Sequence, residues 1–105
     1  MFISEEIESR VSQKAHSNVI AIFDCQKEEV SIEGDFLSIC FGENNIFRFT
    51  TKNKTVFKIL ESKSVLAIIN DGNIKYVFDI CSIEIKKEQN YTVTVEALKY
   101  EKKVI

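Results

Sequence analysis

From residue 19 onward the chain alternates between apolar runs and short polar turns, a pattern typical of a mainly β protein. Residues 19–25 are apolar at most positions, which indicates a strand buried on both faces. The same reasoning predicts further strands at residues 30–41, 46–51, 65–69, 74–86 and 91–98. Residues 100–105 are expected to form a basic tail with apolar ends, outside the last strand.

Polar turns and two irregular positions define how these strands connect. Residues 42–45 and 70–73 have the Gly, Asn and Asp content of hairpin turns, and the Asp-Gly pair of the second tolerates positive φ. Gly34 interrupts the second strand, which predicts a bulge or a sharp bend there. The apolar parity of the fifth strand shifts near Ile80, which predicts a bulge at that position.

Two short helices complete the predicted elements. Residues 4–14 follow a good N-cap, Ser4, and carry an apolar residue every four positions. A second helix is expected over residues 54–62, with Asn53 as its cap. The buried side of this helix is expected to consist of Val56, Phe57, Ile59 and Leu60.

Together these elements predict a mainly β fold with two short helices (α+β), a small antiparallel six-stranded split β-barrel. Hairpin-linked strands that are apolar on both faces favour a closed or nearly closed barrel. The length of 105 residues is enough for one core, so a single domain over residues 1–105 is expected. An open sheet of five or six strands with helices on one side is the alternative.

Composition and charge narrow the classes of function. Lys and Arg number 14 against 16 Asp and Glu, for a net charge of −2, and the charges are interspersed. A nucleic-acid-binding protein needs a basic face, so nucleic acid is an unlikely partner, and scattered lysines are the only source of such a face here. No run approaches the ~20 apolar residues of a membrane helix, and the acidic start is not typical of a signal peptide. A cytoplasmic protein without a membrane partner is expected.

The three cysteines and the single histidine predict no metal site or nucleophile. Cys25, Cys40 and Cys81 are far apart in sequence, form no CxxC motif and lie in apolar runs, so small buried thiols are expected. His16 lies in a polar connector, so neither a Cys-His metal site nor a Ser-His-Asp or Cys-His nucleophile can be argued. Catalytic residues stay unknown at this level.

The corner between the third strand and the second helix is the best candidate for binding chemistry. The strand ends in Thr50 and Thr51, and a helix start offers free amide N–H groups and a partial positive charge, which suit a phosphate. Lys52 and Lys54 oppose the helix dipole, a conflict that a bound anion would remove. The alternative is a β-branched strand end followed by solvated lysines.

The order of elements over nearly the whole chain resembles the FMN-binding split barrels of the pyridoxamine 5'-phosphate oxidase-like family. The best local match is Phe49-Thr50-Thr51, followed by Ile59-Leu60-Glu61 and the strand at 65–69. The resemblance implies a homodimer that holds FMN in a cleft between subunits, with its phosphate near this corner, and a small FMN-dependent oxidoreductase. The cofactor-binding residues it implies are Arg48, Phe49, Thr50, Thr51, Lys54 and Lys58.

Several family features are missing from this chain. The family's Gly-x-Pro in the first hairpin is replaced by residues 27–30, Lys-Glu-Glu-Val. The family's Ser and its Lys or Arg after the threonines fall near Lys54 and Val56, so the basic partner is lost or displaced. An alternative function is therefore a split-barrel dimer that has lost the cofactor and acts as a non-catalytic interaction module.

Overall fold

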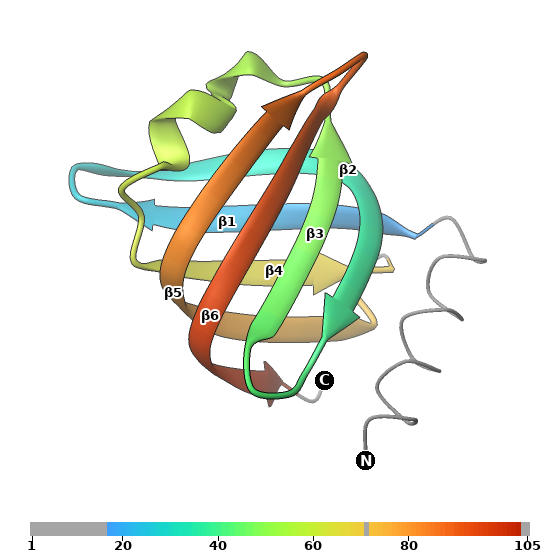
Figure 1. Cartoon of the computed structure of the whole chain (residues 1–105), viewed down its shortest axis with the longest axis vertical. Coiled ribbons are helices and arrows are strands. Elements are labelled where there is room, and N and C mark those ends of the chain that lie inside the picture. Colours follow the sequence, from blue (N-terminus) through green and yellow to red (C-terminus); the bar gives the residue numbers. More distant parts are fainter. Residues whose placement is uncertain (1–16, 71, 104–105) are drawn as a thin grey trace.

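Six antiparallel strands pair in the order β1-β2-β3-β6-β5-β4 and close on themselves, because β4 also pairs with β1 (Figure 1). This arrangement is seen in a computed structural model that describes residues 17–70 and 72–103. The predicted mainly β fold with a six-stranded antiparallel barrel is confirmed. The helix predicted at residues 4–14 lies outside the described residues.

The strands match the predicted runs closely, except at the end of the chain. Their bounds are β1 (Asn18–Cys25), β2 (Glu28–Cys40), β3 (Asn45–Thr51), β4 (Ser64–Ile69), β5 (Ile74–Lys87) and β6 (Tyr91–Lys103). The prediction that residues 100–105 form a tail outside the last strand was wrong for the part up to Lys103, which pairs with Lys75 of β5. Residues 98–103 are exposed at every position, so no apolar alternation revealed this part of the strand.

The inner faces of the strands meet in an aromatic and aliphatic core. Phe47 of β3 lies near its centre, with its ring centroid 5.2 Å from that of Phe49 and 5.4 Å from that of Phe78. Phe36 of β2 stacks on the same ring at 6.4 Å. Phe47, Phe49 and Phe78 are fully buried, so strands from both sides of the barrel share one core.

β2 bends at Gly34, where it leaves β1 and joins β3. Asp35 is the turning point, since it pairs with Asn18 of β1 and with Thr50 of β3. The predicted bend at Gly34 is present, and the bulge in this strand lies a little further on, between Phe36 and Ser38. The second predicted bulge, near Ile80 of β5, is confirmed by two shifts in the β5–β6 register.

The second helix is shorter than predicted. It is a 3-10 helix, η1 (Lys54–Ile59), and it contacts β1, β2, β5 and β6 at one end of the barrel (Figure 1). Val56 and Ile59 are buried as predicted, but Phe57 and Leu60 are 55% and 49% exposed. Three residues per turn place positions i and i+3 on one face, so Val56 shares its face with Ile59, and Phe57 lies on another face.

We expect Gly34→Ala to destabilise the barrel by about 2 kcal/mol or more, the cost of overpacking without room to relax. A Cβ at this position would lie 2.1 Å from the carbonyl oxygen of Thr50, which belongs to a paired backbone. Chemical denaturation measures the loss. Gly72→Ala is the control: it meets no atom within 4 Å, and its φ of 92° costs about 1 kcal/mol. Equal losses in the two variants would contradict the close-approach argument.

Candidate functional site

The hydroxyl of Thr51 ties the end of β3 to the bent part of β2. Its Oγ1 donates to the carbonyl oxygen of Glu33 at 2.7 Å and accepts from the amide of Asn53 at 3.1 Å. Thr51 is only 4% exposed. Both hydrogen bonds of this hydroxyl are therefore to backbone groups, and the buried polar group has the partners that it needs.

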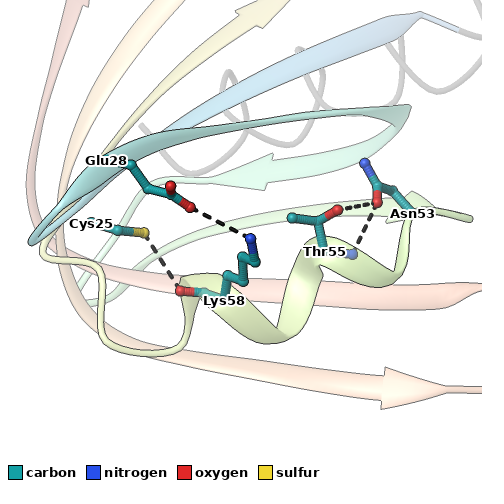
Figure 2. Close-up of polar contacts among 5 residues, drawn as sticks. All are labelled: Cys25, Glu28, Asn53, Thr55 and Lys58. Carbon is teal, nitrogen blue, oxygen red and sulfur yellow. Dashed lines mark hydrogen bonds and ion pairs between the residues drawn. The ribbon is translucent and has the colours of Figure 1, made fainter.

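The backbone N–H groups at the start of η1 are hydrogen-bonded to neighbouring residues, as Figure 2 shows for Asn53 and Thr55. The side-chain oxygen of Asn53 accepts from the amide of Thr55 at 2.9 Å and from the Thr55 hydroxyl. The amide of Val56 donates to the carbonyl of Asn53 at 3.3 Å. The predicted cap is confirmed, but the amides of residues 53, 55 and 56 are engaged within the chain and are not free for a phosphate.

Lys58 faces the β1–β2 hairpin. Its Nζ lies 3.6 Å from a carboxylate oxygen of Glu28, and its carbonyl accepts a weak hydrogen bond from the Cys25 thiol at 3.5 Å (Figure 2). Both charged side chains are more than half exposed, so this ion pair adds little stability. Its position directs the Lys58 ammonium toward the hairpin.

A cavity of about 700 Å³ opens on the outside of the barrel beside the bend of β2. Gly34, Thr50 and Thr51 form one wall, and Ile20 and Ile68 supply apolar surface on the opposite strands β1 and β4. The remaining lining residues are Asn18, Val19, Glu33, Asp35, Lys52, Gly72, Lys75 and Asn90. Its volume lies within the roughly 300–1,000 Å³ typical of small-molecule sites.

A second hollow, of about 500 Å³, lies next to the first, between Ser31 and Glu33 of β2 and the segment from Thr51 to Asn53. It shares Glu33, Thr51 and Lys52 with the first cavity. Across the two hollows the lysines are offset by the carboxylates of Glu33 and Asp35, so the charge is balanced rather than positive. An anionic ligand would be attracted by the Lys52 ammonium and repelled by the Glu33 carboxylate.

The structure separates the residues that the sequence grouped as a cofactor site. Thr50 and Thr51 line the cavity, but Arg48 lies further along the outer side of β3, opposite Thr94 of β6. Phe49 is fully buried in the core, so its ring is not presented to a ligand in this conformation. Lys54 and Lys58 belong to η1 and are outside the cavity lining.

The sequence did not indicate the lining residues that come from distant strands. Ile20, Ile68 and Lys75 reach the cavity from β1, β4 and β5 through the pairing of Ile20 with Ile68 and of Ile68 with Lys75. No local motif marks them. The signal that could have found them is the apolar character of 19–25 and 65–69 on both faces, which leaves aliphatic side chains on the outside.

The cysteines differ from the predicted set of buried thiols. Cys40 and Cys81 are exposed, and only Cys25 is partly buried. Cys40 is exposed as the last residue of β2, and Cys81 is exposed at the β5 bulge that the parity shift near Ile80 predicts. Within residues 17–70 and 72–103, no group of three or more His, Cys, Asp or Glu side chains is placed to hold a metal ion.

Comparison with protein-family models and with curated proteins gave no match for this chain. Within the described part of the chain, no helix is long and apolar enough to cross a membrane.

We expect Thr51→Val to destabilise the protein by about 2 kcal/mol, because it leaves the Glu33 carbonyl and the Asn53 amide without their partner. Thr51→Ser keeps the hydroxyl and should lose less than half as much. Urea denaturation of both variants and of Thr50→Val, whose side chain is not buried in this way, makes the comparison. A Thr51→Val protein as stable as Thr50→Val would show that the hydroxyl does not hold the corner.

Alkylation should distinguish the three thiols. Burial raises the pKa of the Cys25 thiol, and the carboxylates of Glu28 and Asp24 raise it further, so less thiolate is present at a given pH. Iodoacetamide followed by peptide mass spectrometry should label Cys40 and Cys81 at least about tenfold faster than Cys25. In denaturant the three rates should become similar. Labelling of native Cys25 at the rate of Cys40 would contradict this order.

Proposed function

We propose that this protein is a homodimeric split-barrel flavoprotein that binds FMN in the cavity beside the bend of β2, and that it acts as a small FMN-dependent oxidoreductase. The observation that carries the proposal is the cavity of about 700 Å³ at the corner formed by Thr50 and Thr51. The element order that resembles the FMN-binding split barrels supports it.

The apolar wall of the cavity suits the ring system of a flavin. Ile20 and Ile68 are paired neighbours on β1 and β4, and together they offer a flat aliphatic surface. An aromatic ring placed against such a surface gains from apolar burial at about 25 cal/mol per Å². Asn18 and Asn90 add amide groups that can donate to and accept from the polar edge of a flavin or its ribityl chain.

Lys52 and Thr50 are the groups proposed to hold the phosphate. Lys52 follows the last residue of β3 and lines both hollows, and Thr50 contributes a hydroxyl to the wall. Glu33 opposes them, because its carboxylate would face a phosphate that carries close to two negative charges. We therefore expect an affinity in the micromolar range, lower than a site with several cations would give.

When FMN is bound, the redox chemistry belongs to its ring, and the protein supplies binding, orientation and electrostatics. In this proposal Ile20 and Ile68 orient the ring and limit access of water to one of its faces. Lys52 supplies positive charge at the phosphate end.

A cofactor-free interaction module is the second candidate function. The amides that a phosphate would use at the start of η1 are engaged within the chain, and Phe49 is buried in the core. Both observations favour a barrel that keeps the fold and acts through its surface. The two candidates make opposite predictions for the same titration.

Titration with FMN, followed by flavin fluorescence, tests the proposal. Lys52→Ala should weaken binding about tenfold, the equivalent of about 1.4 kcal/mol, and Glu33→Gln should strengthen it by a similar factor. Riboflavin, which lacks the phosphate, should bind with an affinity that neither variant changes by more than about twofold.

Lys99→Ala is the matched control, since Lys99 is an exposed lysine on β6 paired with Asp79 and lies outside the cavity lining. It should bind FMN like the unmodified protein. Absence of saturable binding up to about 1 mM FMN, which corresponds to only about −4 kcal/mol, would overturn the flavin proposal and favour the interaction module.

A further inference from the structure

The outside of the barrel has two flanks of different chemistry. Where β3, β6 and the second half of β5 lie side by side, the outward positions are polar, as at Arg48, Thr92 and Thr94. Where β1, β4 and the first half of β5 lie side by side, the central outward positions are aliphatic. We call these five residues the aliphatic face: Ile20, Ile22, Leu66, Ile68 and Val77.

The aliphatic face is continuous across three strands. Ile20 pairs with Ile68 and Ile22 with Leu66, and Leu66 pairs with Val77. Such directly opposed side chains contact one another on the outside of a sheet. All five are partly exposed, in contrast to the buried residues that alternate with them along each strand. A contiguous exposed apolar patch of this kind marks an interaction surface.

The described part of the chain begins beside this face. Ser17 is only 5% exposed, and its carbonyl accepts a hydrogen bond from the amide of Phe36 at 2.9 Å. β1 starts at the next residue, and Ile20 is the first residue of the aliphatic face along the chain. Residues 1–16, which lie outside the described residues, are therefore joined to the barrel at a fixed point next to Ile20.

The sequence of residues 1–16 suits an aliphatic surface. The helix predicted at residues 4–14 has an apolar stripe formed by Ile3, Ile7 and Val11. Its 11 positions correspond to a length of about 16 Å. The three strands of the aliphatic face span two strand spacings, about 10 Å. A helix of this length is therefore long enough to cross from β1 to β5.

The charges on the two sides of the aliphatic face differ in sign. On the side of β1 and β2, the exposed charged residues aligned with the face are all acidic: Asp24, Glu29 and Glu33. On the side of β5 and β6, three lysines outnumber two carboxylates: Lys75, Lys99 and Lys103 against Asp79 and Glu101. The first side is thus negative, and the second has a small excess of positive charge.

The charges of residues 1–16 have the complementary order. The first half contains Glu5, Glu6 and Glu8, and the second half contains Arg10 and Lys14. Because the second half adjoins β1, its two cations would lie near the acidic side of the face. The three glutamates would then reach the side that carries the lysines. Attraction between opposite charges favours this direction across the strands over the reverse one.

We propose that residues 1–16 of the same chain dock on the aliphatic face as an amphipathic helix that crosses from β1 to β5, with Ile7 against Leu66 and Val77. The inference goes beyond the proposed function and does not require that FMN binds. Ile20 and Ile68 belong both to the face and to the cavity lining, so the docked segment borders the cavity.

Photo-crosslinking in the full chain, without FMN, tests the docking. With p-benzoylphenylalanine in place of Ile7, irradiation should link position 7 to a peptide of the same chain that contains Leu66 or Val77. Peptide mass spectrometry of the product at the monomer mass of 12.1 kDa identifies the linked peptide. The matched control carries the same probe in place of Glu5, which lies about 200° away from Ile7 around a helix and should give at most about a tenth of the yield.

Three results of this experiment would overturn the proposal. They are equal yields from positions 5 and 7, no product or a product on another surface from position 7, and a product of twice the chain mass whose yield rises with protein concentration. The last of these would show that a second copy occupies the face.

Urea denaturation of the full chain gives a second readout. Ile7→Ser and Leu66→Ser should each lower the urea midpoint, and the double variant should lose clearly less than the sum, because both changes remove the same contact. Ile7→Ser combined with Thr94→Ala, on the polar flank, should be additive. Additive losses for Ile7→Ser and Leu66→Ser would contradict the contact.

A charge reversal tests the direction of the segment. At low ionic strength, Lys75→Glu should lower the crosslink yield from position 7 at least about threefold, because it repels the glutamates of the segment. Lys86→Glu, an exposed lysine on the polar flank, should leave the yield unchanged. Equal effects of the two reversals would contradict the proposed direction.

The flavin titration fails independently of this proposal. A specific crosslink in a protein that binds no FMN would leave the docking standing and remove the flavin function. Saturable FMN binding without the crosslink would do the reverse.

Discussion

The close approach of Gly34 to the Thr50 carbonyl is the constraint on which the closed barrel depends. β2 pairs with β1 before this point and with β3 after it, so the strand must turn within one or two residues. A side chain at position 34 would occupy the space of the Thr50 oxygen. Without the turn, β3 would not continue the sheet, and the core around Phe47 would lose one side. The contact between Gly34 and the Thr50 carbonyl thus explains why a glycine is needed where β2 changes its partner from β1 to β3.

The same bend shapes the outside of the molecule. It opens the cavity whose wall contains Gly34 and Thr50, and it brings the Glu33 carbonyl within reach of the Thr51 hydroxyl. The Thr51 hydroxyl is thus used within the chain, by the Glu33 carbonyl and the Asn53 amide. The Thr-Thr motif, which suggests phosphate binding in the sequence, therefore mainly stabilises the backbone at this corner. What remains for a ligand is the side chain of Lys52 and the apolar wall, rather than the start of η1. A cofactor here would depend on side chains, not on backbone amides.

Much of the fold could be predicted from the sequence because its signals are local. Apolar runs, hairpin turns, the glycine in β2 and the parity shift in β5 each act within a few residues, and each was found where expected. The end of β6 was not predictable, because residues 98–103 show no apolar alternation. Its place is defined by pairing with β5 and by the stacking of Tyr100 on Phe41, which come from distant parts of the chain. The faces of η1 were assigned incorrectly because a 3-10 helix turns every three residues, and periodicity over six residues cannot distinguish this from an α-helix.

The site was less predictable than the fold because it is assembled from strands far apart in sequence. Ile20, Ile68 and Lys75 share a wall only through barrel pairing, and nothing in their neighbourhoods marks them. A strand that is apolar on both faces was interpreted as buried on both, yet a single-layer barrel of this size has only one interior. The second apolar face of β1 and β4 lies on the outside, where Ile20, Ile22, Leu66 and Ile68 are partly exposed. The apolar residues of this second face therefore mark an outer surface of the barrel, not a second interior.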